Sequence, residues 1–274
     1  FISVDTFLFS DLLKNVDKRM LKYYTLPTNA FRLSTYVDAP AGSGLGTSST
    51  LVVAIIGAFA EMLKLPLGEY DIAKYAYEIE RKDLGLAGGK QDQYAATFGG
   101  INFMEFYKDE KVIVNPLRIR QEYLNELENN LVLFYTSTSR ESAAIIKEQQ
   151  KNVLQKNQSS IDAMHSLKEQ AFRMKEALLR GELNEIGEIL NFGFAQKRKM
   201  AENISNEKIE NIYSAAIEAG ANGGKISGAG GGGFMIFYCP GNTRYDVIAS
   251  LIKFGGEVKQ FHFTKQGLNS WTAQ

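Results

Sequence analysis

The spacing of hydrophobic and polar residues changes along the chain, and each pattern predicts a different element. Residues 31–38 alternate apolar and polar side chains, which is typical of a strand. Residues 51–63 are apolar on nearly every side and are followed by a stop at residues 64–66, which favours a buried helix. We expect a second helix over residues 69–82 and a short one over residues 91–98.

The rest of the chain is predicted to combine strands with a long helical stretch. The predicted elements are, in order, strands over 101–107, 111–117 and 131–138, helices between 142 and 219, two short strands around a glycine loop over 223–238, a helix over 243–254 and a strand over 257–263. The change near residue 129 from mixed to helix-rich sequence predicts two domains, residues 1–128 and residues 129–274.

A glycine loop precedes the first buried helix. Residues 40–50 read PAGSGLGTSST, with four hydroxyl side chains where the helix begins. Glycines let the backbone approach a ligand closely, and successive N–H groups at a helix N-terminus bind anions. Taken alone, the loop is equally compatible with a flexible turn. The chain contains no G-x-x-x-x-G-K-[ST], so this is not a Walker A loop.

A second glycine loop, GAGGGG, occupies residues 228–233. It matches G-x-G-x-x-G formally, but a predicted strand follows it, whereas a dinucleotide-binding loop is followed by a helix. A dinucleotide oxidoreductase is therefore excluded. Five glycines in six positions lose much backbone entropy on folding, which favours a loop lying against a ligand over a plain turn.

A third segment, residues 85–100, carries candidate chemistry. Lys90 and Asp92 lie where an Ala-Gly-Gly loop enters a predicted helix. An isolated aspartate at that position is most often an N-cap. Beside bound phosphates, the same carboxylate could accept the proton of an attacking hydroxyl group.

Composition narrows the class of protein. The chain of 274 residues has 31 Lys and Arg against 31 Asp and Glu, which gives no reason to expect a nucleic acid or an anionic membrane as partner. Its single cysteine, Cys239, excludes an internal disulfide and fits a reducing cytoplasm. The longest apolar run, residues 51–60, is too short to span a bilayer. The chain begins with Phe1 and not with Met, so we expect the native protein to have residues upstream.

Together, the three segments resemble the GHMP kinase superfamily. Pro40 to Ser49 match its P-x-x-x-G-L-G-S-S-A motif with Thr47 at the first Ser, residues 225–233 match its C-terminal glycine motif, and Gly89 to Asp92 match its G-x-x-D segment. Within the superfamily, residues 83–106 are most similar to D-glycero-D-manno-heptose 7-phosphate kinases.

The resemblance implies a two-domain α+β fold. Its N-terminal domain would contain a left-handed βαβ unit, against the usual right-handed rule, and its C-terminal domain would be ferredoxin-like. ATP and substrate would meet in the cleft between the domains. The implied reaction transfers the γ-phosphate of ATP, with Mg²⁺, to the anomeric hydroxyl of a sugar phosphate, D-glycero-D-manno-heptose 7-phosphate, to give the 1,7-bisphosphate.

The resemblance also implies roles for individual residues. Asp92 would be the catalytic base with Lys90 as a catalytic cation, and Ser48 and Glu80 would bind Mg²⁺, although Glu80 by itself reads as an exposed helix charge. The residues expected to cradle ATP are Gly42, Ser43, Gly44, Leu45, Gly46, Thr47, Ser48 and Ser49. The residues expected to contact the sugar are Gly88, Gly89, Arg140, Lys225, Gly228, Ala229, Gly230 and Gly231.

Two alternatives remain open at this point. The chain could be another sugar kinase of the superfamily, fucokinase-like or galactokinase-like, or a non-catalytic regulator that binds a nucleotide or sugar. Retention of Ser48, Glu80 and Asp92 together argues against a regulator, because binding alone needs neither a metal pair nor a base. The N-terminal substrate motif of the superfamily has no match in residues 1–30, so a cationic partner of the base is expected upstream.

Overall fold

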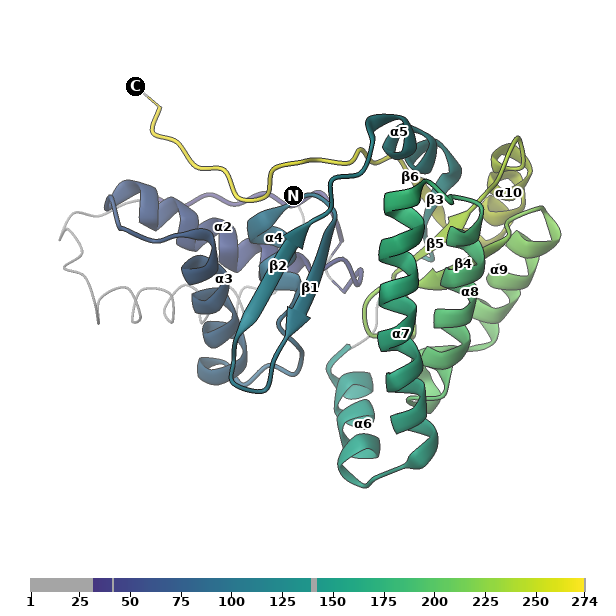
Figure 1. The fold of residues 1–274 in the computed structure, drawn as a ribbon, viewed down its shortest axis with the longest axis horizontal. Coiled ribbons are helices and arrows are strands. Elements are labelled where there is room, and N and C mark those ends of the chain that lie inside the picture. Colours follow the sequence, from purple (N-terminus) through teal and green to yellow (C-terminus); the bar gives the residue numbers. More distant parts are fainter. Residues whose placement is uncertain (1–31, 41, 139–141, 274) are drawn as a thin grey trace. The chain divides into compact units, whose positions relative to one another are not determined.

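The computed structural model describes residues 32–40, 42–138 and 142–273, drawn as a ribbon in Figure 1. Its contacts separate two compact units. The described part of unit 1 comprises residues 32–40, 46–114 and 264–273, and that of unit 2 comprises residues 42–45, 115–138 and 142–263. The predicted domain boundary between residues 128 and 129 stays a prediction. No helix in the described ranges is long and apolar enough to cross a membrane.

Unit 1 is built mainly from helices. Its elements are α2 (Thr47–Met62), α3 (Glu69–Glu78), the π-helical turn η1 (Ile79–Asp83), α4 (Gln91–Phe98), and the strands β1 (Asn102–Phe106) and β2 (Val112–Pro116), of which β2 continues into unit 2.

The core of unit 1 forms between α2 and α3. Val52 and Ile56 of α2 are fully buried and pack with Ala76 of α3. Leu268 of the C-terminal segment 264–273 packs against the same cluster. The last residues of the described chain therefore complete the core of its first unit.

Unit 2 combines a four-stranded sheet with helices. Its elements are α5 (Gln121–Asn130), β3 (Leu131–Tyr135), α6 (Ser142–Leu154), α7 (Gln158–Arg180), α8 (Glu185–Arg198), η2 (Glu202–Ile204), α9 (Glu207–Glu218), β4 (Gly223–Ile226), β5 (Phe234–Tyr238), α10 (Arg244–Leu251), η3 (Ile252–Phe254) and β6 (Glu257–Lys259).

The sheet of unit 2 has the order β4-β5-β3-β6, and every neighbouring pair is antiparallel. Counted along the chain, these four strands stand in the order second, third, first, fourth, which is the ferredoxin-like arrangement. The predicted ferredoxin-like domain is confirmed.

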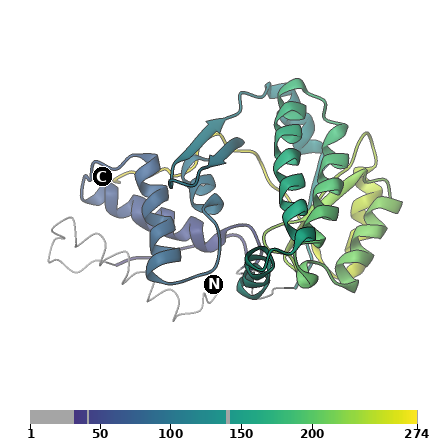
Figure 2. The same ribbon diagram turned by 60° about the horizontal axis from the view of Figure 1, so that its bottom comes forward.

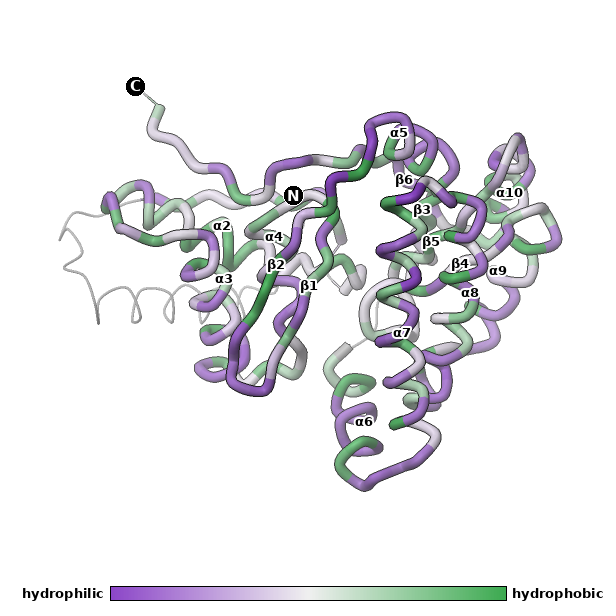
Figure 3. Tube along the Cα trace, viewed as in Figure 1, coloured by the Kyte–Doolittle hydropathy of each residue, from purple (hydrophilic) through white to green (hydrophobic). Residues whose placement is uncertain are grey.

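Helices cover this sheet and bury its apolar side chains. Phe134 of β3 and Phe237 of β5 are fully buried and share a core with Phe194 of α8 and Ile212 of α9. Helix α7 lies alongside α8, as Figures 1 and 2 show. Hydrophilic and hydrophobic stretches alternate along α7 in Figure 3, as expected of a helix with one face on its neighbours.

Most predicted elements are present, with a few differences. Residues 32–38 form no strand, because no described segment offers them a neighbouring strand with which to pair. The last strand, β6, is shorter than predicted, and α5 was not predicted at all. Only Leu127 and Asn130 of its ten residues are buried, so the sequence of α5 lacks the regular apolar spacing that predicts a helix. The described part of unit 1 contains only the strand pair β1–β2, so the left-handed βαβ unit stays a prediction.

Candidate active site

The two glycine loops of the sequence come together in unit 2. The backbone N–H of Phe234 donates to the carbonyl of Ser43 at 3.0 Å, and the hydroxyl of Ser227 donates to the carbonyl of Gly44 at 2.9 Å. A Cβ atom added to Gly228, whose φ is +61°, would lie 2.7 Å from the Cα of Gly44. These contacts hold the start of the first glycine loop against the second.

The first glycine loop ends where α2 begins. Gly46 is the N-cap, with a φ of 72°, and no described side chain caps this end of the helix. The carbonyl of Gly46 accepts the hydrogen bond of the Thr50 N–H at 2.9 Å. The first N–H groups of an α-helix have no partner within the helix and carry a partial positive charge, so this end of α2 suits an anion.

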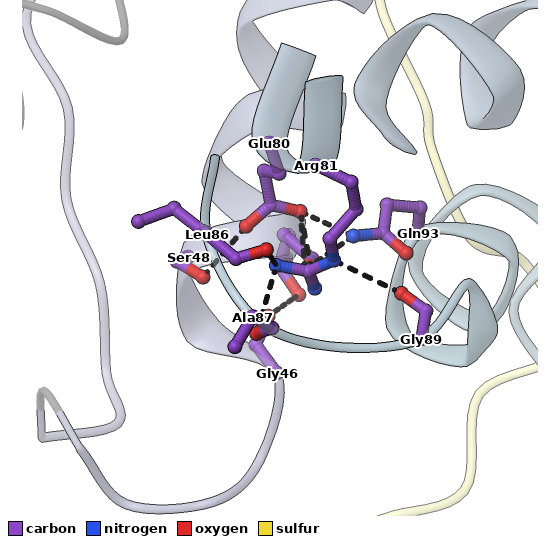
Figure 4. A network of polar contacts seen from close by, with 10 residues as sticks. Gly46, Ser48, Glu80, Arg81, Leu86, Ala87, Gly89 and Gln93 are labelled. Carbon is purple, nitrogen blue, oxygen red and sulfur yellow. Dashed lines mark hydrogen bonds and ion pairs between the residues drawn. The ribbon is translucent and has the colours of Figure 1, made fainter. Parts of the chain in front are cut away.

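Glu80 lies at the centre of a polar cluster in unit 1 (Figure 4). Its side chain is fully buried, so the interpretation of Glu80 as an exposed helix charge is wrong. The Ser48 hydroxyl donates to its Oε1 at 2.9 Å, and the Ser49 hydroxyl donates to its Oε2 at 2.6 Å. Glu80 belongs to η1, and π-helical turns of this kind are frequent at functional sites.

Gln93 completes this cluster and was missed by the sequence reasoning. It is fully buried, and its Nε2 donates both to Oε2 of Glu80 and, at 3.0 Å, to the hydroxyl of Ser49. Its own Oε1 has no hydrogen-bond partner among the described residues. The only signal in the sequence is that Gln93 directly follows Asp92.

Ser48 and Glu80 fit the requirements of Mg²⁺. The ion binds oxygen ligands in octahedral geometry at about 2.0–2.1 Å, so neighbouring ligands lie about 2.8–3.0 Å apart. The Ser48 hydroxyl and Oε1 of Glu80 are 2.9 Å apart. The described residues contain no group of three or more His, Cys, Asp or Glu that could hold a metal. Mg²⁺ commonly takes one or two protein ligands and completes its shell with waters and substrate phosphates.

Asp92 lies in the first turn of α4, against the first glycine loop. A Cβ atom added to Gly46 would lie 3.1 Å from the carboxyl carbon of Asp92. The N-cap of α4 is Lys90, so the interpretation of Asp92 as an N-cap is wrong. Partial burial raises the pKa of Asp92 and the charge of Glu80 raises it further, while Arg81 opposes the rise. A carboxylate with a raised pKa is a better proton acceptor than an ordinary surface aspartate.

Arg81 holds the loop that leads to Asp92. Its Nε donates to the carbonyl of Gly89 at 3.1 Å and its Nη1 to the carbonyl of Ala87 at 3.3 Å, while its Nη2 lies 4.0 Å from Oε2 of Glu80 (Figure 4). Gly88 has a φ of +153°, and a Cβ atom there would lie 2.6 Å from the guanidinium carbon of Arg81. One guanidinium group therefore links the buried carboxylate to the loop.

The predicted catalytic cation Lys90 contacts residues outside the glycine loops. The Lys90 ammonium forms an ion pair with Glu110 at 2.8 Å and lies 4.9 Å from the ring centroid of Tyr77. Its catalytic role stays a prediction. Arg140 lies outside the described residues. Lys225, in β4, has a pKa lowered by burial.

The second glycine loop is fixed by contacts within unit 2. The N–H of Gly231 donates to the carbonyl of Ile204 at 2.8 Å, and a Cβ atom on Gly230 would lie 2.7 Å from that oxygen. Gln149 donates to the carbonyl of Ala229 at 3.4 Å. These contacts order the loop, and its contact with a sugar stays a prediction, as does that of Gly88 and Gly89.

Known proteins resemble both halves of the chain. Residues 11–100 match the family model described as GHMP kinases N terminal domain, and residues 174–256 match that described as GHMP kinases C terminal. The chain is 51% identical over 261 residues to the D-glycero-alpha-D-manno-heptose 7-phosphate kinase of Campylobacter jejuni, covering 95% of this chain and 76% of that protein.

Two further relatives bear on the alternatives. A crystal structure of a D-glycero-D-manno-heptose 1-phosphate kinase from Bacteroides thetaiotaomicron superposes with a TM-score of 0.79 at 42% identity, covering 96% of this chain and 75% of that chain. The bifunctional fucokinase/GDP-fucose pyrophosphorylase of Arabidopsis thaliana is 28% identical over 206 residues, which cover 74% of this chain and 19% of that protein.

Proposed function

Since the chain belongs to the GHMP kinase superfamily, we propose that it transfers the γ-phosphate of ATP to the anomeric hydroxyl of D-glycero-D-manno-heptose 7-phosphate, giving the 1,7-bisphosphate. The observation that carries this proposal is the 51% identity to a heptose 7-phosphate kinase over 95% of the chain. The fucokinase relative is much more distant, at 28% identity. The small-molecule partners are therefore ATP and a sugar phosphate, and a cytoplasmic location stays a prediction.

Asp92 is the group we assign to the attacking hydroxyl. It accepts the proton of that hydroxyl, or a hydrogen bond from it, as phosphate transfer proceeds. Its raised pKa suits it to receive a proton, and the charge of Arg81 opposes the rise. In the described part of the chain no hydrogen bond reaches this carboxylate, which leaves its lone pairs available to a substrate.

The phosphates of ATP would lie on the first glycine loop and the start of α2. Backbone N–H groups there supply donors without a large positive surface, in keeping with the zero net charge of the chain. Ser48 and Glu80 would hold Mg²⁺, which neutralises charge on the β- and γ-phosphates when it is bound. Gln93 and Ser49 fix the orientation of the Glu80 carboxylate.

Turnover of the purified protein tests the assignment of Asp92. We expect ADP release with heptose 7-phosphate to fall about 10²- to 10⁴-fold in Asp92→Asn, because the proton acceptor is lost. Binding of ATP, measured by calorimetry, should be unchanged within about twofold, since the asparagine is isosteric. Wild-type turnover in Asp92→Asn would contradict the mechanism.

A sugar panel tests the substrate. Heptose 7-phosphate, the same heptose without phosphate, fucose and galactose are compared by kcat/KM. The proposal requires the phosphorylated heptose to exceed the others by at least about 10²-fold, because an unfilled phosphate site leaves buried polar groups unpaired. Preference for fucose or galactose would identify another sugar kinase. Binding of ATP without turnover of any sugar would indicate a regulator.

A further inference from the structure

A lysine outside every sequence motif lies on the second glycine loop. Lys197 is in the last turn of α8, and its ammonium group donates a hydrogen bond to the carbonyl of Gly228. Lys225, in β4, lies three positions before Gly228, the first residue of the same loop. Gly228 in turn packs on Gly44 of the first glycine loop. Lys197 is thus anchored where the two loops meet within unit 2, and Lys225 lies in the strand that leads into the second loop.

The two lysines have no negative partner in the described part of the chain. Neither forms an ion pair there with a carboxylate. Burial lowers the pKa of both side chains. For Lys197, the charge of Lys225 lowers the pKa further, to about 7. Two neighbouring, desolvated ammonium groups without a counter-charge repel each other. A bound dianion would offset this repulsion and favour the protonated, charged form of both lysines.

We propose that Lys197 and Lys225 bind the phosphate group that the sugar substrate already carries. This inference rests on the proposed function for the identity of the sugar. Phosphate monoesters are dianions with several acceptor oxygens, and two lysines can each donate a charge-assisted hydrogen bond to one. The backbone N–H groups of the first glycine loop, with Ser48 and Glu80 for Mg²⁺, already account for the phosphates of ATP. The lysine pair is therefore available for a second phosphate.

Steady-state kinetics test the site. Lys197→Gln and Lys225→Gln should each raise the KM for heptose 7-phosphate by roughly 10- to 100-fold, the loss expected for a hydrogen bond to a charged group. The KM for ATP should stay within about twofold. Lys197→Arg, which keeps the charge, should recover most of the affinity. Melting temperatures confirm that each variant is folded.

Lys199 provides the matched control. It follows Lys197 by two residues, is exposed, and its ammonium group donates to the side-chain oxygen of Gln196 at 3.0 Å. Lys199→Gln removes the same charge and should leave both KM values unchanged. The inference is overturned if Lys197→Gln leaves the KM for the sugar phosphate unchanged, or if the KM for ATP rises instead.

Binding of inorganic phosphate separates this inference from the proposed function. Calorimetry is carried out on the whole protein with a non-hydrolysable ATP analogue bound, so that the nucleotide site is filled. Binding by the wild type that is lost in both glutamine variants supports the lysine site, even if no sugar phosphate is turned over and the proposed function fails. Equal binding by wild type and variants, or none by the wild type in the presence of the analogue, overturns it.

Discussion

Glu80 and Asp92 are two carboxylates of unit 1 that the protein surrounds in opposite ways. Glu80 is fully buried and accepts hydrogen bonds from two serine hydroxyls and an amide. Asp92 is accessible at the surface and receives no hydrogen bond from the described residues, although neighbouring atoms partly desolvate its carboxylate. Glu80 is therefore held in one orientation, which suits its proposed role as a metal ligand, whereas the accessible carboxylate of Asp92 suits its proposed role toward the attacking hydroxyl.

Arg81 makes the proposed role of Asp92 as a base testable by pH. A base acts when ionised, so kcat should fall as the pH falls through the pKa of Asp92. Arg81→Gln removes the charge that lowers this pKa, so the pKa rises and the acidic limb of the kcat profile moves to higher pH.

Arg81→Lys is the control for this measurement. It keeps the positive charge but cannot reach both carbonyls that the guanidinium group contacts, so kcat should fall while the acidic limb stays near its wild-type position. A limb that does not move in Arg81→Gln would show that Asp92 is not the titrating base.

At the scale of single residues, the sequence identifies candidates that belong to a motif and misses residues whose role depends on contacts made in the folded chain. Ser48 and Asp92 could be named because each follows glycines in a recognisable loop. Gln93 could not, because its role depends on Glu80, which is 13 residues away. Lys197 lies in the run QKRK, which in sequence is indistinguishable from a solvated helix end.

At the scale of elements, η1 and the loop after it are joined by the contacts of Arg81. The π-helical turn carries both Glu80 and Arg81, and Arg81 fastens carbonyls of the loop that enters α4. Gly88 gives Arg81 the room to do so, since any side chain there would meet the guanidinium group. The position of Asp92 at the start of α4 thus depends on a residue eleven positions earlier.

Gly88→Ala tests this contact between Arg81 and the loop. The added methyl group would push Arg81 away from the loop, and we expect kcat/KM to fall by up to about 10²-fold, because small displacements of a catalytic group are costly. Gly85→Ala is the control: Gly85 also has a positive φ, of +65°, but a Cβ atom there meets nothing within 4 Å. Equal losses of activity in the two variants would contradict the role of Arg81.

Elements were predictable where the local chemistry is strong. The helix over 91–98, the strands around the second glycine loop and the long helical stretch were all expected from periodicity and glycine spacing. Residues 32–38 have the alternation of a strand but no strand beside them, and alternation cannot supply a partner. The π-helical turn could not be predicted from the sequence either, because it leaves the apolar spacing of residues 69–82 almost unchanged.

At the scale of the whole molecule, the chain returns to unit 1 after unit 2 is complete. The C-terminal segment 264–273 packs on α2 and α4: Leu268 lies over Gly57, and its N–H donates to the carbonyl of Thr97 at 3.0 Å. Glycine at position 99 permits this return, because a Cβ atom there would overlap the backbone of Gln266 and Gly267.

Gly99→Ala should therefore release the C-terminal segment. Its φ of +62° strains any side chain, and the overlap adds to that strain, so we expect a loss of about 3 kcal/mol or more in the free energy of unfolding. Gly100→Ala has a similar φ, of +69°, with no backbone atom closer than 3.6 Å, and should lose only about 1 kcal/mol. Urea denaturation measures both, and similar losses would contradict the packing described for the segment.

This return also sets an order of events during synthesis. Unit 1 receives its final segment only after the roughly 150 residues of unit 2 have been made, which takes about 10–30 seconds at typical rates of translation. Until then Gly57 and the neighbouring apolar residues of α2 lack the cover that Leu268 provides. The last strand of unit 2, β6, is made shortly before the C-terminal segment 264–273. Unit 2 can therefore finish folding before unit 1, although most of unit 1 is synthesised earlier.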